Sequence, residues 1–266
     1  MTKEEKESLY TLRWHVREKW GTESGKEKSL EILGSLLDPE AQPEARPSSS
    51  GSEQHLLWCP FALNNFPKAP TKGSYRKGYP EGAIVHFTAG RYHDLADSLS
   101  SQIKNGYTYF VIDQDGNIGQ NFPLDSWGYH AGESKWQGLG ESVSSKLVGI
   151  EVQCAGKVKP KGTKYETWFG SIIEQEQVRH IAQNTANQQE AGHYHKYTSA
   201  QEGALKRLIL WLHRNNSEVF SLDYVLGHDE VSGPKGIGKW RKNDPGGSLS
   251  KTMDDFRIEL KADVEN

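Results

Sequence analysis

Short apolar runs, separated by glycine and other turn residues, follow one another along the chain after about residue 55. Residues 83–89 (AIVHFTA) and 146–156 (KLVGIEVQCAG) carry β-branched and aromatic side chains at the density typical of strands. Residues 107–122 contain an apolar run, the polar turn DQDGN and a second short run. This order predicts a β-hairpin.

Two other segments have the spacing of helices. Residues 199–216 place leucine and isoleucine side chains on one face, between a Thr198–Ser199 start and an Asn215–Asn216 stop. Residues 170–189 also carry isoleucine and valine at helical spacing, which predicts a second helix there. Strands interspersed with helices predict an α/β fold, with a mixed central β-sheet flanked by helices.

The first part of the chain has a different pattern. Residues 2–20 and 26–37 alternate apolar and charged positions and predict short helices. The stretch PEAQPEARPSSSGSEQ that follows is rich in proline, serine and glutamate and predicts a linker. We therefore expect a small helical N-terminal segment (1–40), a linker (41–54) and a main domain (55–266).

Composition narrows the classes of function. Hydrophobic residues make up 35% of the chain and charged residues 25%, and the net charge is −3, which argues against nucleic-acid binding. No apolar run approaches the roughly 20 residues that span a bilayer, so membrane insertion is not expected. The N-terminus lacks the apolar core of a secretory signal, which predicts synthesis in the cytoplasm. Cys59 and Cys154 are expected to be reduced, buried thiols, with a single disulfide as the alternative.

His86 is the first candidate for chemistry, because it interrupts an apolar strand. An imidazole left without a partner there would cost about 1–3 kcal/mol, and a lone histidine in a strand is more often a hydrogen-bonded core residue than a ligand. His228 and Asp244 flank a glycine- and lysine-rich loop much later in the chain. Two imidazoles and one carboxylate suit a catalytic zinc site, although no compact motif joins them. The residues alone are therefore compatible with two interpretations of His86, as a hydrogen-bonded core residue or as a metal ligand.

Glu151 lies in the centre of another apolar strand. A carboxylate is costly to bury there unless it is paired or functional. The alternation of the strand places Cys154 on the opposite face, so Cys154 is not expected to be a ligand. A salt-bridged strand residue and a general base are the two interpretations of Glu151, and the general base is favoured.

Seven stretches make the chain resemble the type 2 N-acetylmuramoyl-L-alanine amidases, a family that includes peptidoglycan recognition proteins and phage endolysins. They are VHFTAG, YFVIDQDGNIGQ, WGYHAGESKWQG, LVGIEVQCAG, YTSAQEGALKRLILWL, LGHDEVSGPKG and KNDPGG, in the family's order between about residues 80 and 250. The resemblance implies a zinc ion held by His86, His228 and Asp244. It also implies that Glu151 is the catalytic acidic residue and that Lys242 stabilises the developing oxyanion.

The resemblance further implies a substrate groove beside the metal. His130 matches a groove residue that is not usually a metal ligand. Where several relatives carry a catalytic tyrosine, this chain has Thr108, with Tyr109 next to it. Thr108 and Tyr109 are therefore expected to contact substrate together with His130. Trp127 flanks the motif loops and is expected either to contact substrate or to pack in the core or rim.

The implied activity is hydrolysis of the amide bond between N-acetylmuramic acid and L-alanine in peptidoglycan. A lytic enzyme of phage or prophage type is favoured, with a holin as the candidate partner for its release to the cell wall. A non-catalytic peptidoglycan-binding protein and a cytoplasmic amidase that recycles muropeptides are the alternatives. Because all ligand positions and the acidic position are filled, the enzyme is favoured over the binding protein.

Overall fold

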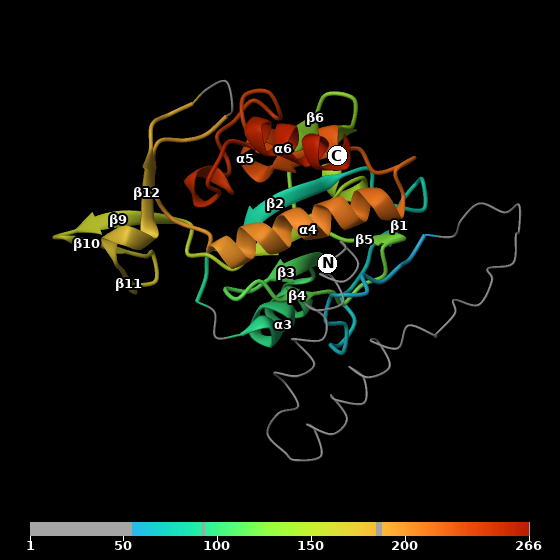
Figure 1. The fold of residues 1–266 in the computed structure, drawn as a ribbon, viewed down its shortest axis with the longest axis horizontal. Helices are drawn as coiled ribbons and strands as arrows, with labels where there is room; N and C mark the ends of the chain where they lie inside the picture. The colour runs from blue at the N-terminus through green and yellow to red at the C-terminus, as the bar shows by residue number, and fades with distance from the viewer. Residues whose placement is uncertain (1–54, 92–93, 185–187, 266) are drawn as a thin grey trace, which may run out of the picture. The chain divides into compact units, whose positions relative to one another are not determined.

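A mixed five-stranded sheet organises the computed structural model, which describes residues 55–91, 94–184 and 188–265 (Figure 1). The strand order is β14-β2-β8-β3-β4. The strands are β2 (Ala83–Phe87), β3 (Tyr109–Ile112), β4 (Ile118–Gly119), β8 (Val148–Val152) and β14 (Val225–Gly227). The first four strands in this order run parallel and β4 runs antiparallel, so the predicted α/β fold with a mixed central sheet is confirmed.

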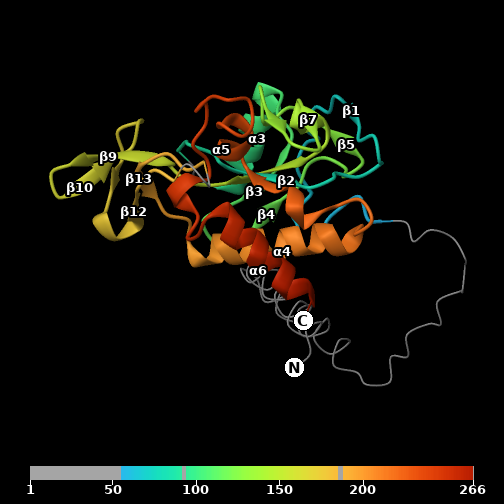
Figure 2. The ribbon, with the colours of Figure 1, turned by 90° about the horizontal axis from the view of Figure 1, so that it is seen from above.

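Helices cover both faces of this sheet. Figure 2 shows α4 (Ser199–Asn215) and α6 (Met253–Glu265) on one face and α3 (Leu95–Asn105) and the short α5 (His228–Ser232) on the other. The largest apolar core lies under α4 and α6 and includes side chains from β2, β3, β8 and β14. With helices on both faces, the parallel strands are buried and consist almost wholly of apolar residues.

The best-defined predictions of local structure are confirmed. Helix α4 begins after Thr198, whose hydroxyl accepts a hydrogen bond from the Gln201 N–H while the Gln201 side chain accepts one from the Thr198 N–H. The predicted hairpin is β3 and β4, joined by a turn in which Asp113 accepts hydrogen bonds from the backbone of Asp115 and Asn117. Short polar side chains therefore satisfy the backbone where each element ends or turns.

The prediction of a helix over residues 170–189 is wrong. The region belongs to a second, antiparallel sheet with the order β11-β10-β9-β13-β12, referred to below as the peripheral sheet. Its strands are β9 (Lys157–Lys161), β10 (Lys164–Glu166), β11 (Ile172–Ile173), β12 (Val178–Ile181) and β13 (Gly192–His195). The isoleucines and valine that mimic a helical stripe are β-branched, and β12 pairs with β13 along its whole length.

The remaining described elements are short. They are the two-residue strands β1 (Gly73–Ser74), β5 (Ser126–Trp127), β6 (Lys135–Trp136) and β7 (Gly140–Glu141), and the 3₁₀ helices η1 (Val143–Ser145), η2 (Gln175–Gln177), η3 (Leu222–Tyr224) and η4 (Gly246–Ser248). Cys59 and Cys154 are both buried and are not joined in a disulfide, as expected. Within the described part of the chain, no helix is long and apolar enough to cross a membrane. The predicted N-terminal segment (1–40) and linker (41–54) lie outside the described residues.

Candidate active site

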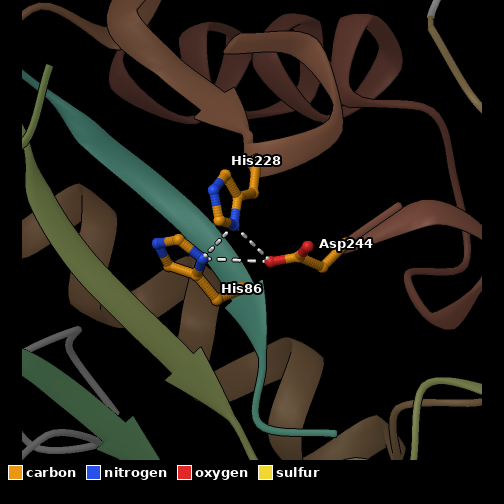
Figure 3. Close-up of side chains that lie close together, drawn as sticks. All are labelled: His86, His228 and Asp244. Atoms are coloured by element: carbon orange, nitrogen blue, oxygen red, sulfur yellow. Dashed lines mark hydrogen bonds and ion pairs between the residues drawn. The ribbon is translucent and has the colours of Figure 1, made fainter. Parts of the chain in front are cut away.

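Three side chains from separate parts of the sequence converge beside the central sheet (Figure 3). His86 lies near the carboxyl end of β2, and His228 follows directly after β14 as the first residue of α5. Because β2 and β14 are parallel neighbours, these two ends meet at the same edge of the sheet, where ligands bind in open α/β sheets. Asp244 reaches the same point from the loop that precedes η4.

The three side chains are buried and in direct contact. His86 Nδ1 lies 2.9 Å from His228 Nδ1, and each of these nitrogens lies 3.0 Å from Asp244 Oδ2. All three residues are at most 5% exposed. The sequence was compatible with His86 as a core residue or as a metal ligand, and this convergence favours the metal ligand.

The Nε2 atoms of His228 and His130 each face a backbone carbonyl. His228 Nε2 lies 2.9 Å from the Ala131 carbonyl, and His130 Nε2 lies 2.9 Å from the Leu147 carbonyl. A carbonyl only accepts, so these two contacts favour a proton on both Nε2 atoms, against the weaker contact of the donor-only Arg241 Nη2 with His228 Nε2 at 3.3 Å. In neutral His130 the Nδ1 atom is then bare and accepts a hydrogen bond from His86 Nε2, 3.1 Å away. The neutral forms of His86 and His228 consequently both direct an Nδ1 lone pair at Asp244.

The charges of the site agree with this arrangement. Burial lowers the pKa of His86 to about 4, with the neighbouring His228 adding to the shift, and burial lowers the pKa of His130 well below its ordinary value. Burial alone would raise the pKa of Asp244, but positive charge and hydrogen bonds from His228 and His86, which need a proton on the facing Nδ1 atoms, outweigh burial and hold that pKa below its ordinary range. A proton, or a metal cation in its place, between the Nδ1 atoms and the carboxylate therefore stabilises this cluster.

This donor set fits a zinc ion. Zinc bonds of about 2.0–2.1 Å in tetrahedral geometry place neighbouring ligand atoms roughly 3.3 Å apart, slightly more than the 2.9–3.0 Å found here. A cation between the three lone pairs would also relieve their mutual repulsion. Nitrogen and carboxylate oxygen are the ligand types that zinc prefers, and three protein ligands leave a fourth position for water or substrate.

Asp229, which the sequence analysis did not identify, ties two of these ligand segments together. Its backbone N–H donates to the Asp244 carbonyl at 2.8 Å. Its carboxylate accepts a hydrogen bond from the Gly246 N–H at 3.2 Å, on the far side of Asp244. Asp229 therefore holds the Asp244 loop against the segment that carries His228. Its only signal in the sequence was its place next to a histidine, which predicts no such contact.

Glu151 stands beside the three ligand candidates. It is the register partner of His86 in the ladder of β2 and β8, so both side chains leave the same face of the sheet. Its Oε2 atom is buried and has no hydrogen-bond partner among the described residues. Burial raises the pKa of Glu151 to about 8, with the charge of Asp244 adding to the shift and Lys242 opposing it. Among the described residues the carboxyl group has no salt-bridge partner, and its raised pKa makes the ionised form a stronger base than an ordinary glutamate.

Gly149, two residues before Glu151 and on the same face of β8, makes room for His130. A Cβ atom at this position would lie 2.8 Å from Cγ of His130 and 2.9 Å from Cβ of Tyr109. The His130 ring thus packs directly on the backbone of β8, where it can reach His86. The expected contact of His130 with substrate stays a prediction, because the structure places its ring behind a ligand candidate.

The other predicted site residues have distinct surroundings. Lys242 is exposed on the loop two residues before Asp244, close enough for its charge to lower the pKa values of His86 and Glu151. Thr108 is buried and donates its hydroxyl to the Pro70 carbonyl at 2.7 Å. Tyr109 is buried against α3, and Trp127 is half-buried with its ring against Tyr129. Thr108 already has a partner in the fold, and the substrate contacts of these three residues stay predictions.

Comparisons with known proteins give one strong match. The family profile described as N-acetylmuramoyl-L-alanine amidase matches residues 76–247, whereas a comparison with curated protein sequences found no match. Among solved structures, an AmpD protein is 18% identical, with 76% of this chain and 94% of that chain covered and a TM-score of 0.48. The amidase AmiD from E. coli, solved with anhydro-N-acetylmuramic acid-L-Ala-D-γ-Glu-L-Lys, is 19% identical over 64% of this chain and 55% of that chain, with a TM-score of 0.43. LysC from Clostridium intestinale is 16% identical over 78% of this chain and 99% of that chain, also with a TM-score of 0.43.

Proposed function

The chain belongs to the N-acetylmuramoyl-L-alanine amidase family, and from that premise we propose that it hydrolyses the amide bond between N-acetylmuramic acid and L-alanine in peptidoglycan with a zinc ion held by His86, His228 and Asp244. One observation carries this proposal. Three buried metal-binding side chains converge next to a carboxyl group whose buried oxygen has no hydrogen-bond partner among the described residues. This combination is what metal-assisted hydrolysis needs.

Zinc supplies Lewis acidity, which makes water a nucleophile at neutral pH. Glu151 removes a proton from the attacking water as the water oxygen bonds to the amide carbon. Glu151 then returns this proton to the departing alanine nitrogen as the carbon–nitrogen bond breaks. Lys242 offsets the negative charge that develops on the carbonyl oxygen, a form of electrostatic stabilisation that is often the largest single contribution to such a reaction.

The chain's own residues hold the reacting groups in place. The hydrogen bonds of His86 to His130 and of His228 to the Ala131 carbonyl orient both rings, as outer partners of metal-bound histidines commonly do. Arg241 donates to the same Ala131 carbonyl at 2.7 Å and to the Glu133 carbonyl at 2.7 Å, which ties the loop of Lys242 and Asp244 to the opposite side of the site.

We extend the proposal to a lytic role. In this role the enzyme is made in the cytoplasm, acts on the cell wall after release, and depends on another protein such as a holin to reach it. The predicted accessory segment and linker ahead of the main domain support a lytic enzyme over one that recycles soluble muropeptides. Intact sacculi and soluble muropeptides therefore both belong among the test substrates.

The test is digestion of isolated peptidoglycan, followed by mass spectrometry of the products. Purified protein should release stem peptides that begin at L-alanine. A chelator should abolish this release, and added zinc should restore it. If the protein binds the wall but releases no peptide in the presence of zinc, the chain is a peptidoglycan-binding protein. Release that survives thorough chelation would contradict the metal-dependent mechanism.

A further inference from the structure

The peripheral sheet is connected to the same edge of the central sheet that carries the candidate active site. Strand β9 follows the carboxyl end of β8, and the loop between β10 and β11 (residues 167–171) returns to the loop after β2. There the indole Nε1 of Trp168 donates to the Ala89 carbonyl at 2.6 Å. Ala89 is three residues beyond His86, which limits their Cα separation to roughly 11 Å.

Trp168 presents a rigid aromatic face to solvent. The residue is 73% exposed, although its only polar side-chain atom already has a partner in the protein. Phe169 packs edge-on against the indole, with ring centroids 5.4 Å apart at 85°. The tight turn itself is held by Thr167, whose hydroxyl accepts a hydrogen bond from the Ser171 N–H at 2.9 Å. A large aromatic side chain that is both exposed and held in place is typical of a binding surface.

One positive charge lies directly beside the loop that carries Trp168. Three of the four lysines in residues 157–173 are paired with glutamates, so this charge comes from Arg91. Arg91, from the loop after β2, donates to the Phe169 carbonyl at 2.6 Å and lies 5.4 Å from the Phe169 ring. A polymer that suits this surface therefore combines flat apolar faces with negative charge. The glycan strand of peptidoglycan has both, in the C–H faces of its sugar rings and in the carboxylates of its stem peptides.

We propose that Trp168 is a stacking platform for a sugar ring of the peptidoglycan glycan strand, outside the site at which the amide bond is cut. This inference rests on the proposed function and specifies its substrate as the polymer. A strand held on Trp168 continues past the carboxyl edge of β2 to His86. A short soluble fragment, in contrast, fills the cutting site without reaching the platform. The platform thus favours intact wall over recycled muropeptides.

The experiment compares Trp168→Ala with the unaltered chain on two substrates. The substrates are insoluble sacculi and a soluble muramoyl peptide that carries a single N-acetylmuramic acid. Removing the ring should lower the ratio of turnover on sacculi to turnover on the soluble fragment by about tenfold, the effect expected of one lost stacking contact. Trp168→Phe, which keeps a ring but loses the hydrogen bond to Ala89, should recover much of this ratio.

Ile258→Ala is the matched control, because Ile258 is 67% exposed on α6 and far along the chain from the peripheral sheet. It should leave the ratio unchanged. An unchanged ratio in Trp168→Ala would overturn the proposal. A Trp168→Phe variant as impaired as Trp168→Ala would also overturn it, because the hydrogen bond and not the ring face would then matter.

A pull-down on sacculi separates failure of the platform from failure of the proposed function. If the unaltered chain cuts neither substrate, the proposed function is wrong, but weaker binding of Trp168→Ala to sacculi still supports the platform. Equal binding of both proteins to sacculi would contradict it. If Trp168→Ala instead lost binding to vesicles of anionic phospholipid and kept its binding to sacculi, the surface would belong to a membrane, and the proposal would be wrong.

Discussion

The central and peripheral sheets each have five strands but lie in different environments. The central sheet is covered by helices on both faces, and its β2 residues Ala83, Ile84 and Val85 are completely buried. The peripheral sheet carries lysines along β9, and its ion pairs Lys161–Glu166 and Lys164–Glu174 lie at the surface. One sheet is therefore a packed interior layer, and the other is largely a surface structure.

This difference explains where the chemistry lies. His86 and Glu151 come from adjacent strands of this packed sheet, where the strand ladder fixes their backbones side by side and His86 is 1% exposed. A metal site needs such fixed positions, because its ligands must stay close to productive geometry before the metal arrives. The peripheral sheet has few buried side chains, so it suits contacts with a large and variable polymer. Changes in the central sheet should therefore alter metal binding and chemistry, and changes in the peripheral sheet should not.

The largest expected effect is the removal of a ligand candidate from the central sheet. His86→Ala leaves two protein ligands and a buried cavity, so we expect zinc binding and turnover on soluble muramoyl peptide to fall below detection. Zinc content after dialysis and a peptide-release assay measure both effects. The matched control is His180→Ala on β12, an exposed histidine of the peripheral sheet, which should keep its zinc and its turnover. Full zinc content in His86→Ala would remove His86 from the ligand set.

The next largest effect is expected at Glu151. Glu151→Gln keeps the size of the side chain but removes the proton acceptor, so kcat should fall by about 10²–10⁴-fold while zinc content stays unchanged. Glu174→Gln on the peripheral sheet, where the carboxylate pairs with Lys164 at the surface, should keep the unaltered kcat. Near-normal turnover of Glu151→Gln would show that another group accepts the proton.

A smaller effect is expected at Gly149, which contacts no ligand candidate directly. Gly149→Ala would place a methyl group 2.8 Å from the His130 ring and so displace the hydrogen-bond partner of His86. Outer partners of metal ligands are typically worth 10–100-fold in metal affinity, so zinc affinity should fall by about that factor. A zinc titration against a competing chelator measures this loss.

The control for Gly149→Ala is Gly162→Ala, in the turn between β9 and β10. Its φ of +63° strains any other residue and should cost about 1 kcal/mol of stability, but nothing lies within 4 Å of the added methyl group. Zinc affinity should therefore stay the same in this variant. Equal zinc affinities for the two variants would mean that the packing of His130 on β8 has no influence on the metal.

A pH-dependent effect is expected in the metal-free protein. Burial raises the pKa of Glu151 from 4.5 to about 8, so the folded state opposes its ionisation more than the unfolded state does. Stability should therefore be lost as the pH rises from about 4.5 through 8. Glu151→Gln removes this loss, and its melting temperature should match that of the unaltered chain near pH 4 and exceed it at pH 9. Thermal unfolding in the presence of a chelator measures the difference, and a constant difference across this range would contradict the burial of a free carboxyl group.

The same contrast between sheets explains what the sequence predicted. The buried strands β2 and β8 stand out as apolar runs, and a histidine or glutamate inside such a run is conspicuous, which is how His86 and Glu151 were found. In the peripheral sheet, short strands with exposed lysines have no such pattern. The isoleucines and valine of residues 170–189 then matched helical spacing by chance. Strand pairing between β12 and β13, and not local preference, decides the structure there.

The parts of the site that the sequence did not predict are backbone contacts between distant segments. The carbonyls of Ala131 and Leu147 contact Nε2 of His228 and His130 and so influence which ring nitrogen is protonated. Every residue type has a backbone carbonyl, so the sequence gives no sign of these contacts. Asp229 acts through its own N–H and through the N–H of Gly246, two groups that also carry no signature in the sequence. The sequence therefore predicted the reactive side chains. The hydrogen bonds that orient these side chains depend on which distant segments the fold brings together.

The smallest effect is expected on the surface of the peripheral sheet. Lys161 and Glu166 form an ion pair with side chains 54% and 36% exposed, and exposed pairs typically contribute about 1 kcal/mol or less. Lys161→Ala should therefore lower the free energy of unfolding by no more than that and leave turnover on soluble muramoyl peptide unchanged. Urea unfolding and the peptide-release assay measure the two quantities. A loss of several kcal/mol, or a fall in turnover on the soluble fragment, would show that the peripheral sheet supports the active site directly, and the separation of roles between the two sheets would then be wrong.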